Sequence, residues 1–156
     1  MTYPSLDTIP EQRPLSGTET TTNHLEVIET VISSLQEDQS AMVSQTGDSY
    51  LWKFKYGTVE VFVQLTGQTE DDTLTVWSPV LKLPAKNEPD LTRKLLELNW
   101  TSTFEARFSI FGDQIVVSAS RTVAELSPAE VSRNITIVAT IADDYDEPLQ
   151  ATYGAG

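Results

Sequence analysis

The fold is decided by residues 90–145, which read DLTRKLLELNWTSTFEARFSIFGDQIVVSASRTVAELSPAEVSRNITIVATIADDY. The stretch begins with leucines at helical spacing, which predict an amphipathic helix ending near Trp100. Pro89 suits the first turn of this helix because that position needs no backbone N–H donor. The predicted apolar stripe consists of Leu91, Leu95, Leu96 and Leu98.

A β-hairpin follows the helix. Residues 104–111 and 115–121 are predicted strands, and they flank Gly112-Asp113. A glycine in the first turn position followed by a polar residue is typical of a type II′ hairpin turn. The side chains predicted to share faces of the two strands are Ala106, Phe108 and Ile110, and Ile115, Val117 and Ala119.

The stretch closes with a strongly marked helix. Ser127-Pro128-Ala129-Glu130 combines an N-cap hydroxyl, a proline in the first helical position and a glutamate three residues after the cap. We expect this helix to end at Pro148, since proline interrupts the helical hydrogen bonds. Its apolar face is predicted to carry Val131, Ile135, Val138, Ala142 and Tyr145.

The first half of the chain supplies another helix and further strands. Asn23 and Glu26 predict a capping-box start for a helix that runs to about Asp38. Three runs show alternating apolar and polar residues or are rich in β-branched and aromatic residues, which predicts strands. Pro79 in the last run indicates that this strand lies at a sheet edge or contains a β-bulge. These runs are residues 50–56, 58–65 and 74–83, preceded by a short candidate strand at residues 42–46 that Gly47-Asp48 ends.

The predicted fold class is therefore α+β, with a single antiparallel sheet of about five strands packed by helices. The predicted order is helix, three strands, helix, two strands, helix. Residues 1–22 form an extended leader rich in threonine, serine and proline, residues 23–148 form one domain, and residues 149–156 form a C-terminal tail.

Three segments in this order resemble the YbjN-like family, whose fold is similar to that of type III secretion chaperones. They are LLELNW at residues 95–100, FSIFGDQIVV at residues 108–117 and LSPAEV at residues 126–131, within a resemblance that covers residues 25–145. The resemblance implies a small, often dimeric bacterial protein linked to regulation or chaperone-like binding. It implies no catalytic residues.

Composition narrows the classes of partner. The 156 residues carry a formal net charge of −13, which disfavours nucleic acid and anionic membrane surfaces as partners. The chain has no cysteine, which excludes disulfides and cysteine-based metal sites. It also lacks an export signal and any apolar run near the about 18 residues that span a bilayer, so we expect a cytoplasmic protein.

Few residues are candidates for chemistry, and we expect no catalytic, cofactor-binding or metal-binding site. His24, the only histidine, is predicted to be exposed at a helix start, and no serine motif accompanies it. The acidic clusters at residues 70–72 and 143–147 could hold a weak divalent cation but are typical of solvated surface. The aromatic stripe of Tyr50, Trp52, Phe54 and Tyr56 is either core, subunit interface or a base-stacking platform.

The sequence favours a non-enzymatic module that binds another polypeptide through apolar sheet or helix surface with an acidic rim, as a homodimer. The alternatives are a small-ligand sensor or hydrolase with a site under the sheet, and a purely structural subunit. An exposed apolar surface would favour the first, and a deep polar pocket would favour the sensor or hydrolase.

Overall fold

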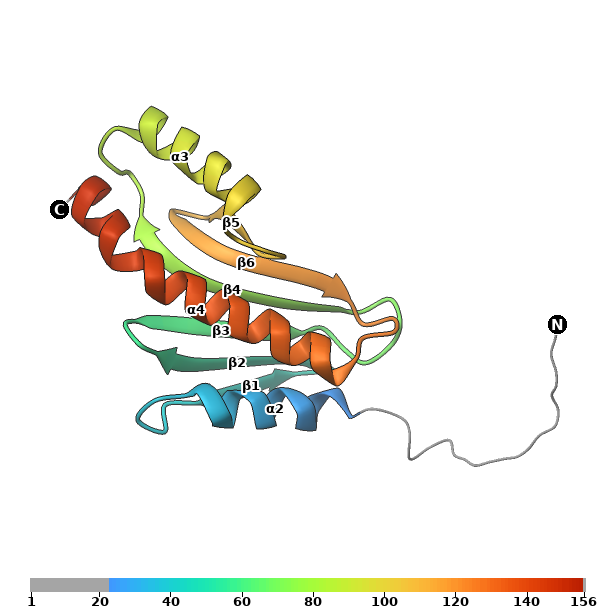
Figure 1. Cartoon of the computed structure of the whole chain (residues 1–156). Helices are drawn as coiled ribbons and strands as arrows, with labels where there is room; N and C mark the ends of the chain where they lie inside the picture. Colours follow the sequence, from blue (N-terminus) through green and yellow to red (C-terminus); the bar gives the residue numbers. More distant parts are fainter. Residues whose placement is uncertain (1–22, 156) are drawn as a thin grey trace, which may run out of the picture.

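The computed structural model describes residues 23–155, so the predicted leader at residues 1–22 lies outside it. Three helices and six strands make up the described chain, and the α+β class is confirmed (Figure 1). In chain order the elements are α2 (His24–Leu35), β1 (Met42–Thr46), β2 (Ser49–Tyr56), β3 (Val59–Leu65), β4 (Thr73–Lys82), α3 (Glu88–Thr101), β5 (Arg107–Phe111), β6 (Gln114–Thr122) and α4 (Pro128–Tyr153).

The strands form one antiparallel sheet in the order β1-β2-β3-β4-β6-β5. The prediction of about five strands is wrong by one, because residues 42–46 pair along β2 instead of standing apart. Thr46 lies opposite Ser49, so Gly47-Asp48 is a two-residue hairpin turn that joins two strands. Gly47-Asp48 therefore connects two paired strands and does not only end the first of them.

Three hairpins close through the same kind of turn. Gly47, Gly57 and Gly112 stand first in their turns with φ of 61°, 57° and 64°. The residues that follow them are not in the positive-φ region, which is the type II′ pattern expected for Gly112-Asp113.

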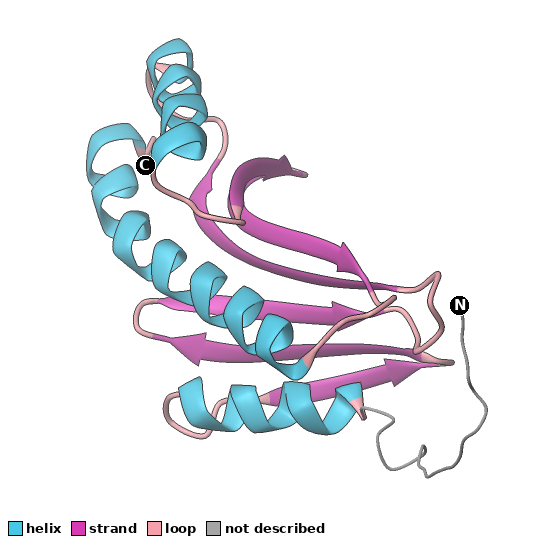
Figure 2. Ribbon diagram, turned by 45° about the vertical axis from the view of Figure 1, so that its right-hand side comes forward, coloured by secondary structure: helices cyan, strands magenta, loops and turns pink. Residues whose placement is uncertain are grey.

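Helices α2 and α4 cover one face of the sheet (Figures 1 and 2). α4 crosses the strands and makes most of its sheet contacts with β4, while α2 packs beside it. Inward-facing side chains of β2, β3, β4 and β6 meet both helices in one apolar core. The largest fully buried members of this core are Phe54, Ile28, Leu65, Leu74, Leu91, Ile135 and Leu149.

Pro79 causes a bulge and not an edge. β4 lies between β3 and β6, and its register with β6 shifts between Pro79 and Leu81. Proline has no backbone N–H to give to the neighbouring strand, so an interior strand accommodates it where the pairing is interrupted.

Two predicted boundaries move. α2 ends at Leu35 instead of about Asp38, because Gln36 already has an extended backbone with φ of −62° and ψ of 151°. The fifth strand begins at Arg107, not at residue 104, since Phe104 has φ of 54°. The Asn23 side chain caps α2 as expected, although the reciprocal bond from Glu26 is not formed.

α4 contradicts the expected stop at Pro148. Its capping box between Ser127 and Glu130 is formed as predicted, but the helix runs on to Tyr153. An interior proline costs about 3 kcal/mol. That cost is offset because Leu149 and Tyr153 beyond it are only 1% and 4% exposed, and full burial of such side chains is worth about 1.5–3 kcal/mol each. Part of the predicted tail therefore belongs to the helix.

Candidate protein-binding surface

The aromatic stripe of β2 is core. Trp52 and Phe54 are buried beneath the helices, and the Trp52 indole Nε1–H donates to the Glu29 carboxylate of α2 at 3.0 Å. Tyr50 stacks on Trp52 with ring centroids 5.6 Å apart. Trp52 and Phe54 are therefore not available to a partner, and the core alternative is the one observed for them, while Tyr50 and Tyr56 are half-buried against the same core.

His24 is buried, which contradicts the expected exposed position. It lies in the first turn of α2, and neither ring nitrogen has a hydrogen-bond partner among residues 23–155. Burial lowers the pKa of the imidazole below its ordinary value, because the charged form loses hydration there. Within the described chain, the side chain is part of the packing and has no hydrogen bond to the carboxylate or hydroxyl that a catalytic base would need.

Part of each acidic cluster is structural, and neither is plain solvated surface. In the loop between β3 and β4, the Asp72 carboxylate accepts hydrogen bonds from Thr69 Oγ1, from the Thr69 N–H and from Thr66 Oγ1 at 2.7, 2.9 and 2.8 Å. These bonds from Thr69 and Thr66 hold the pKa of Asp72 below its usual range. The carboxylate thus closes its own turn.

The second cluster fastens α4 to the turn between β2 and β3. The Thr58 N–H donates to Asp143 Oδ1 at 2.9 Å, and the Thr58 hydroxyl lies 2.8 Å from an Asp146 oxygen. Asp146 is only 4% exposed. Residues 143–147 therefore include two carboxylates that hold the hairpin against the helix, an arrangement that the sequence does not reveal.

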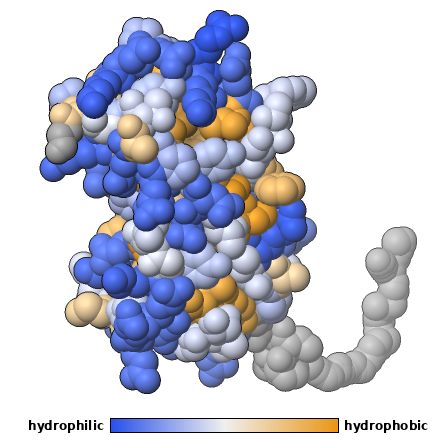
Figure 3. Space-filling view, turned by 60° about the vertical axis from the view of Figure 1, so that its left-hand side comes forward, coloured by the Kyte–Doolittle hydropathy of each residue, from blue (hydrophilic) through white to orange (hydrophobic). Residues whose placement is uncertain are grey.

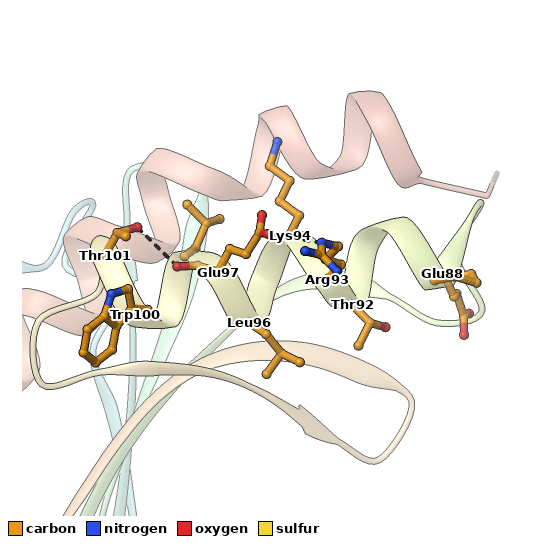
Figure 4. Close-up of a pocket in the computed structure, with 10 residues that line it drawn as sticks. Glu88, Thr92, Arg93, Lys94, Leu96, Glu97, Trp100 and Thr101 are labelled. Atoms are coloured by element: carbon orange, nitrogen blue, oxygen red, sulfur yellow. Dashed lines mark hydrogen bonds and ion pairs between the residues drawn. The ribbon is translucent and has the colours of Figure 1, made fainter.

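The largest exposed apolar side chain in the described residues belongs to α3. Leu91 and Leu95 are buried as predicted, whereas Leu96 is 64% exposed and was wrongly assigned to the buried stripe. Trp100, one turn further on, is 89% exposed. Figure 4 shows both side chains projecting from the same side of the helix, with Lys94 pointing away from them. An open hollow runs along this helix and is lined entirely by α3 residues.

Asn99 fixes α3 against the edge of the sheet. Its carboxamide accepts from the Phe108 N–H at 2.8 Å and donates to the Phe108 carbonyl at 3.3 Å. The side chain thus pairs with β5 as a neighbouring strand would. This contact holds α3 in place while Leu96 and Trp100 remain exposed, and we call these two residues the α3 patch.

A second apolar cluster lies on the sheet face opposite α2 and α4. Phe62 and Trp77 are cross-strand neighbours whose rings stack 5.3 Å apart, and Phe111 meets Trp77 edge-on at 5.7 Å. Phe111 is 57% exposed. We call Phe62, Trp77 and Phe111 the open-face aromatics. Sequence reasoning missed them, although a bulky aromatic at the outward position of each alternating strand was a usable signal.

The interior under the sheet is filled by apolar side chains. Buried polar residues in the described chain are His24, Ser78, Thr103 and Asp146, and they do not converge on one cavity. Within residues 23–155 no three histidine or acidic side chains are grouped as a metal site would require. No helix in this range is long and apolar enough to cross a bilayer.

Figure 3 shows apolar side chains reaching the surface in patches separated by hydrophilic ones. Such a surface can bind partners by apolar burial.

The match to a protein-family model agrees with the resemblance seen in the sequence. No curated protein matches the chain. A solved structure entitled "Crystal Structure of the ExsC-ExsE Complex" is similar over 78% of this chain and 90% of that chain, with 12% identity and a TM-score of 0.49. The family model YbjN, described as "Putative bacterial sensory transduction regulator", matches residues 24–151. The chain belongs to the YbjN family.

Proposed function

We propose that the protein is a non-enzymatic regulatory module that acts by binding another polypeptide and that functions as a homodimer. The observation that carries this proposal is the α3 patch, in which Trp100 and Leu96 are exposed on one side of a well-anchored helix. The family description supports a regulatory role. Exposed apolar surface of this kind is typical of protein interfaces.

The α3 patch suits contact with a second copy of the chain. A tryptophan buries roughly 150–250 Å² when fully covered, so two copies of Trp100 supply a substantial part of the about 1,200–2,000 Å² of a standard interface. The charges on α3 are nearly balanced, with Arg93 and Lys94 offsetting its three acidic residues. In a chain of net charge −13, such a surface brings two copies together with little local repulsion.

Sedimentation equilibrium of the full chain tests the homodimer. We expect a mass twice the 17.3 kDa of the monomer, and we expect Trp100→Ser to shift the protein to the monomer mass. The matched control is Met42→Ser, which removes another exposed apolar side chain far from α3 and leaves the dimer intact. A wild-type protein that remains monomeric at every concentration overturns the homodimer.

Site-specific crosslinking tests the binding of another polypeptide. A benzoyl-phenylalanine at position 100 is expected to crosslink to a second copy of this protein. The same group at position 62, on the sheet face opposite α2 and α4, is expected to crosslink to a different polypeptide. If neither position becomes crosslinked to a polypeptide, the proposed function is contradicted.

A further inference from the structure

The uncovered face of the sheet differs in charge from the rest of the molecule. The register places the side chains of alternate residues of each strand on this face, around the open-face aromatics. The charged residues at these positions are Lys53, Lys55, Lys82 and Arg107 together with Glu60. Four cations and one carboxylate thus lie on this face in a chain whose net charge is −13.

The cations surround the aromatic rings. Lys53, Phe62, Trp77, Ser118 and Arg107 form one row across five neighbouring strands. The row spans four strand spacings, or about 19 Å, with a cation at each end and the two stacked rings between them. Among residues 23–155, the only ion pair on the face joins Lys53 to Glu60 at 3.8 Å, and both side chains are about half exposed.

A hollow with a mainly apolar surface adjoins the rings. It has a volume of about 250 Å³ and is lined by Gln64, Thr75, Trp77, Ser109, Phe111, Val116 and Ser118. The hydroxyls of Ser109 and Ser118 are hydrogen-bonded to each other at 3.1 Å. The face therefore offers aromatic contact, hydroxyl groups and positive charge within one extended strip.

We infer that this open sheet face binds a polypeptide segment that carries acidic residues around apolar side chains. The inference rests on the proposed protein-binding function and specifies the chemistry of the partner. Acidic side chains complement the four cations, and apolar side chains bury against Phe111 and Trp77. At physiological salt the Debye length is about 8 Å, so the nearby cations outweigh the acidic residues elsewhere on the molecule.

The inference differs from the expectation drawn from total charge. The net charge of −13 favours a basic partner for the molecule as a whole, but the acidic residues lie mostly on the helices and loops. A single-stranded nucleic acid would also supply negative charge and stacking rings. The peptide is favoured because a phosphate chain extends beyond this strip and meets the acidic surface around it.

Fluorescence anisotropy with designed peptides tests the inference on the full chain. The probe is a labelled peptide of about ten residues, long enough to cross the strip, in which glutamate alternates with leucine. Two control peptides replace glutamate by lysine or leucine by serine. We expect the wild-type protein to bind the glutamate–leucine peptide at least about tenfold more tightly than either control.

Three variants locate the binding. Lys55→Glu combined with Lys82→Glu reverses two exposed cations, and Phe111→Ser removes the most exposed ring; each is expected to weaken binding about tenfold. Lys94→Glu reverses one exposed cation on α3, half the charge change of the double variant, and is expected to leave binding unchanged. Circular dichroism and urea unfolding verify that each variant is folded.

The inference is overturned if the wild type fails to bind the glutamate–leucine peptide, or if the open-face variants bind as tightly as the wild type. Tighter binding of an oligothymidylate probe, lost in the same variants, assigns the face to nucleic acid and also overturns it. Sedimentation of the same samples separates the two proposals. If the protein is a dimer that does not bind the peptide, the homodimer proposal stands and the open-face inference fails. If the protein is a monomer that binds the peptide, only the homodimer proposal fails.

Discussion

Asp146 shows how a carboxylate is retained inside this protein. The Thr58 hydroxyl lies 2.9 and 2.8 Å from its two oxygens and 3.1 Å from Asp143. A hydroxyl has one proton to donate, and Asp143 already accepts the Thr58 N–H. The Thr58 hydroxyl can therefore donate its hydrogen bond to Asp146, which is the more buried of the two carboxylates.

Substitution of Thr58 tests this role. Thr58→Val keeps the shape of the side chain but removes the donor, and we expect the free energy of unfolding to fall by about 1.5–3 kcal/mol, the usual value for a hydrogen bond to a charged group. Thr58→Ser keeps the hydroxyl and is expected to retain most of the stability. Urea unfolding measures both, and equal losses in the two variants would show that the hydroxyl is unimportant.

His24 gives the protein a sensitivity to acid. Burial lowers the pKa of the folded imidazole, while the unfolded chain takes up a proton near pH 6.5. As the pH falls below about 6.5, the unfolded state binds the proton first, so stability decreases until the folded pKa is reached.

Unfolding measurements at pH 7.5 and at lower pH test the histidine against His24→Phe. We expect the wild type to lose more stability than the variant between about pH 7 and the depressed folded pKa. The carboxylates titrate in both proteins, so the difference between the two curves isolates the histidine. Parallel curves would contradict this prediction.

At the scale of elements, the turn between β2 and β3 is built to receive α4. A Cβ placed on Gly57 would clash with the Asp143 carboxylate, whereas one on Gly47 would meet nothing within 4 Å. Both glycines have positive φ, so they share the backbone cost of an alanine but not the contact.

The two glycines therefore form a matched pair. We expect Gly57→Ala to cost about 1–2 kcal/mol more than Gly47→Ala, because Asp143 must move and give up its hydrogen bond to Thr58. In an Asp143→Ala background, which has already lost this bond, Gly57→Ala should cost only about as much as Gly47→Ala costs in the wild type. Chemical denaturation of the wild type, the three single variants and the double variant measures these costs, and equal costs for the two glycine variants in the wild-type background would refute the contact.

Signals that act within a few residues were predictable from the sequence. The Ser127 capping box and the Gly112-Asp113 turn depend on adjacent backbone, and both form as predicted. Features decided by distant partners were not. The passage of α4 through Pro148 depends on burial against the rest of the fold, and the burial of His24 depends on packing around α2.

The candidate surfaces follow the same division. Helical spacing places Leu96 and Leu98 on different sides of α3, but only the position of α3 at the sheet edge decides which side is exposed. Likewise, strand alternation places Trp77 opposite the core, while strand order alone brings Phe111 from β5 against it.

For the whole molecule, charge opposes association. Two copies that each carry −13 repel one another at low ionic strength, although the charges on α3 are nearly balanced. We expect the dimer to tighten as sodium chloride rises from about 20 to 300 mM, because salt screens this repulsion while apolar burial at Trp100 is retained. Sedimentation across this range measures it, and dissociation on adding salt would indicate that ion pairs dominate.

The bond between Asn99 and Phe108 also limits how the sheet can grow. The Asn99 carboxamide is hydrogen-bonded to the Phe108 N–H and carbonyl, which an incoming strand would need for pairing with β5. Helix α3 also lies beside this edge. In the described chain, β1 at the other end has no charged residue or proline in the sequence MVSQT to deter a strand. Strand addition is therefore less hindered at β1 than at β5: two molecules joined at β1 would present only their β5 ends, where Asn99 and α3 oppose further pairing.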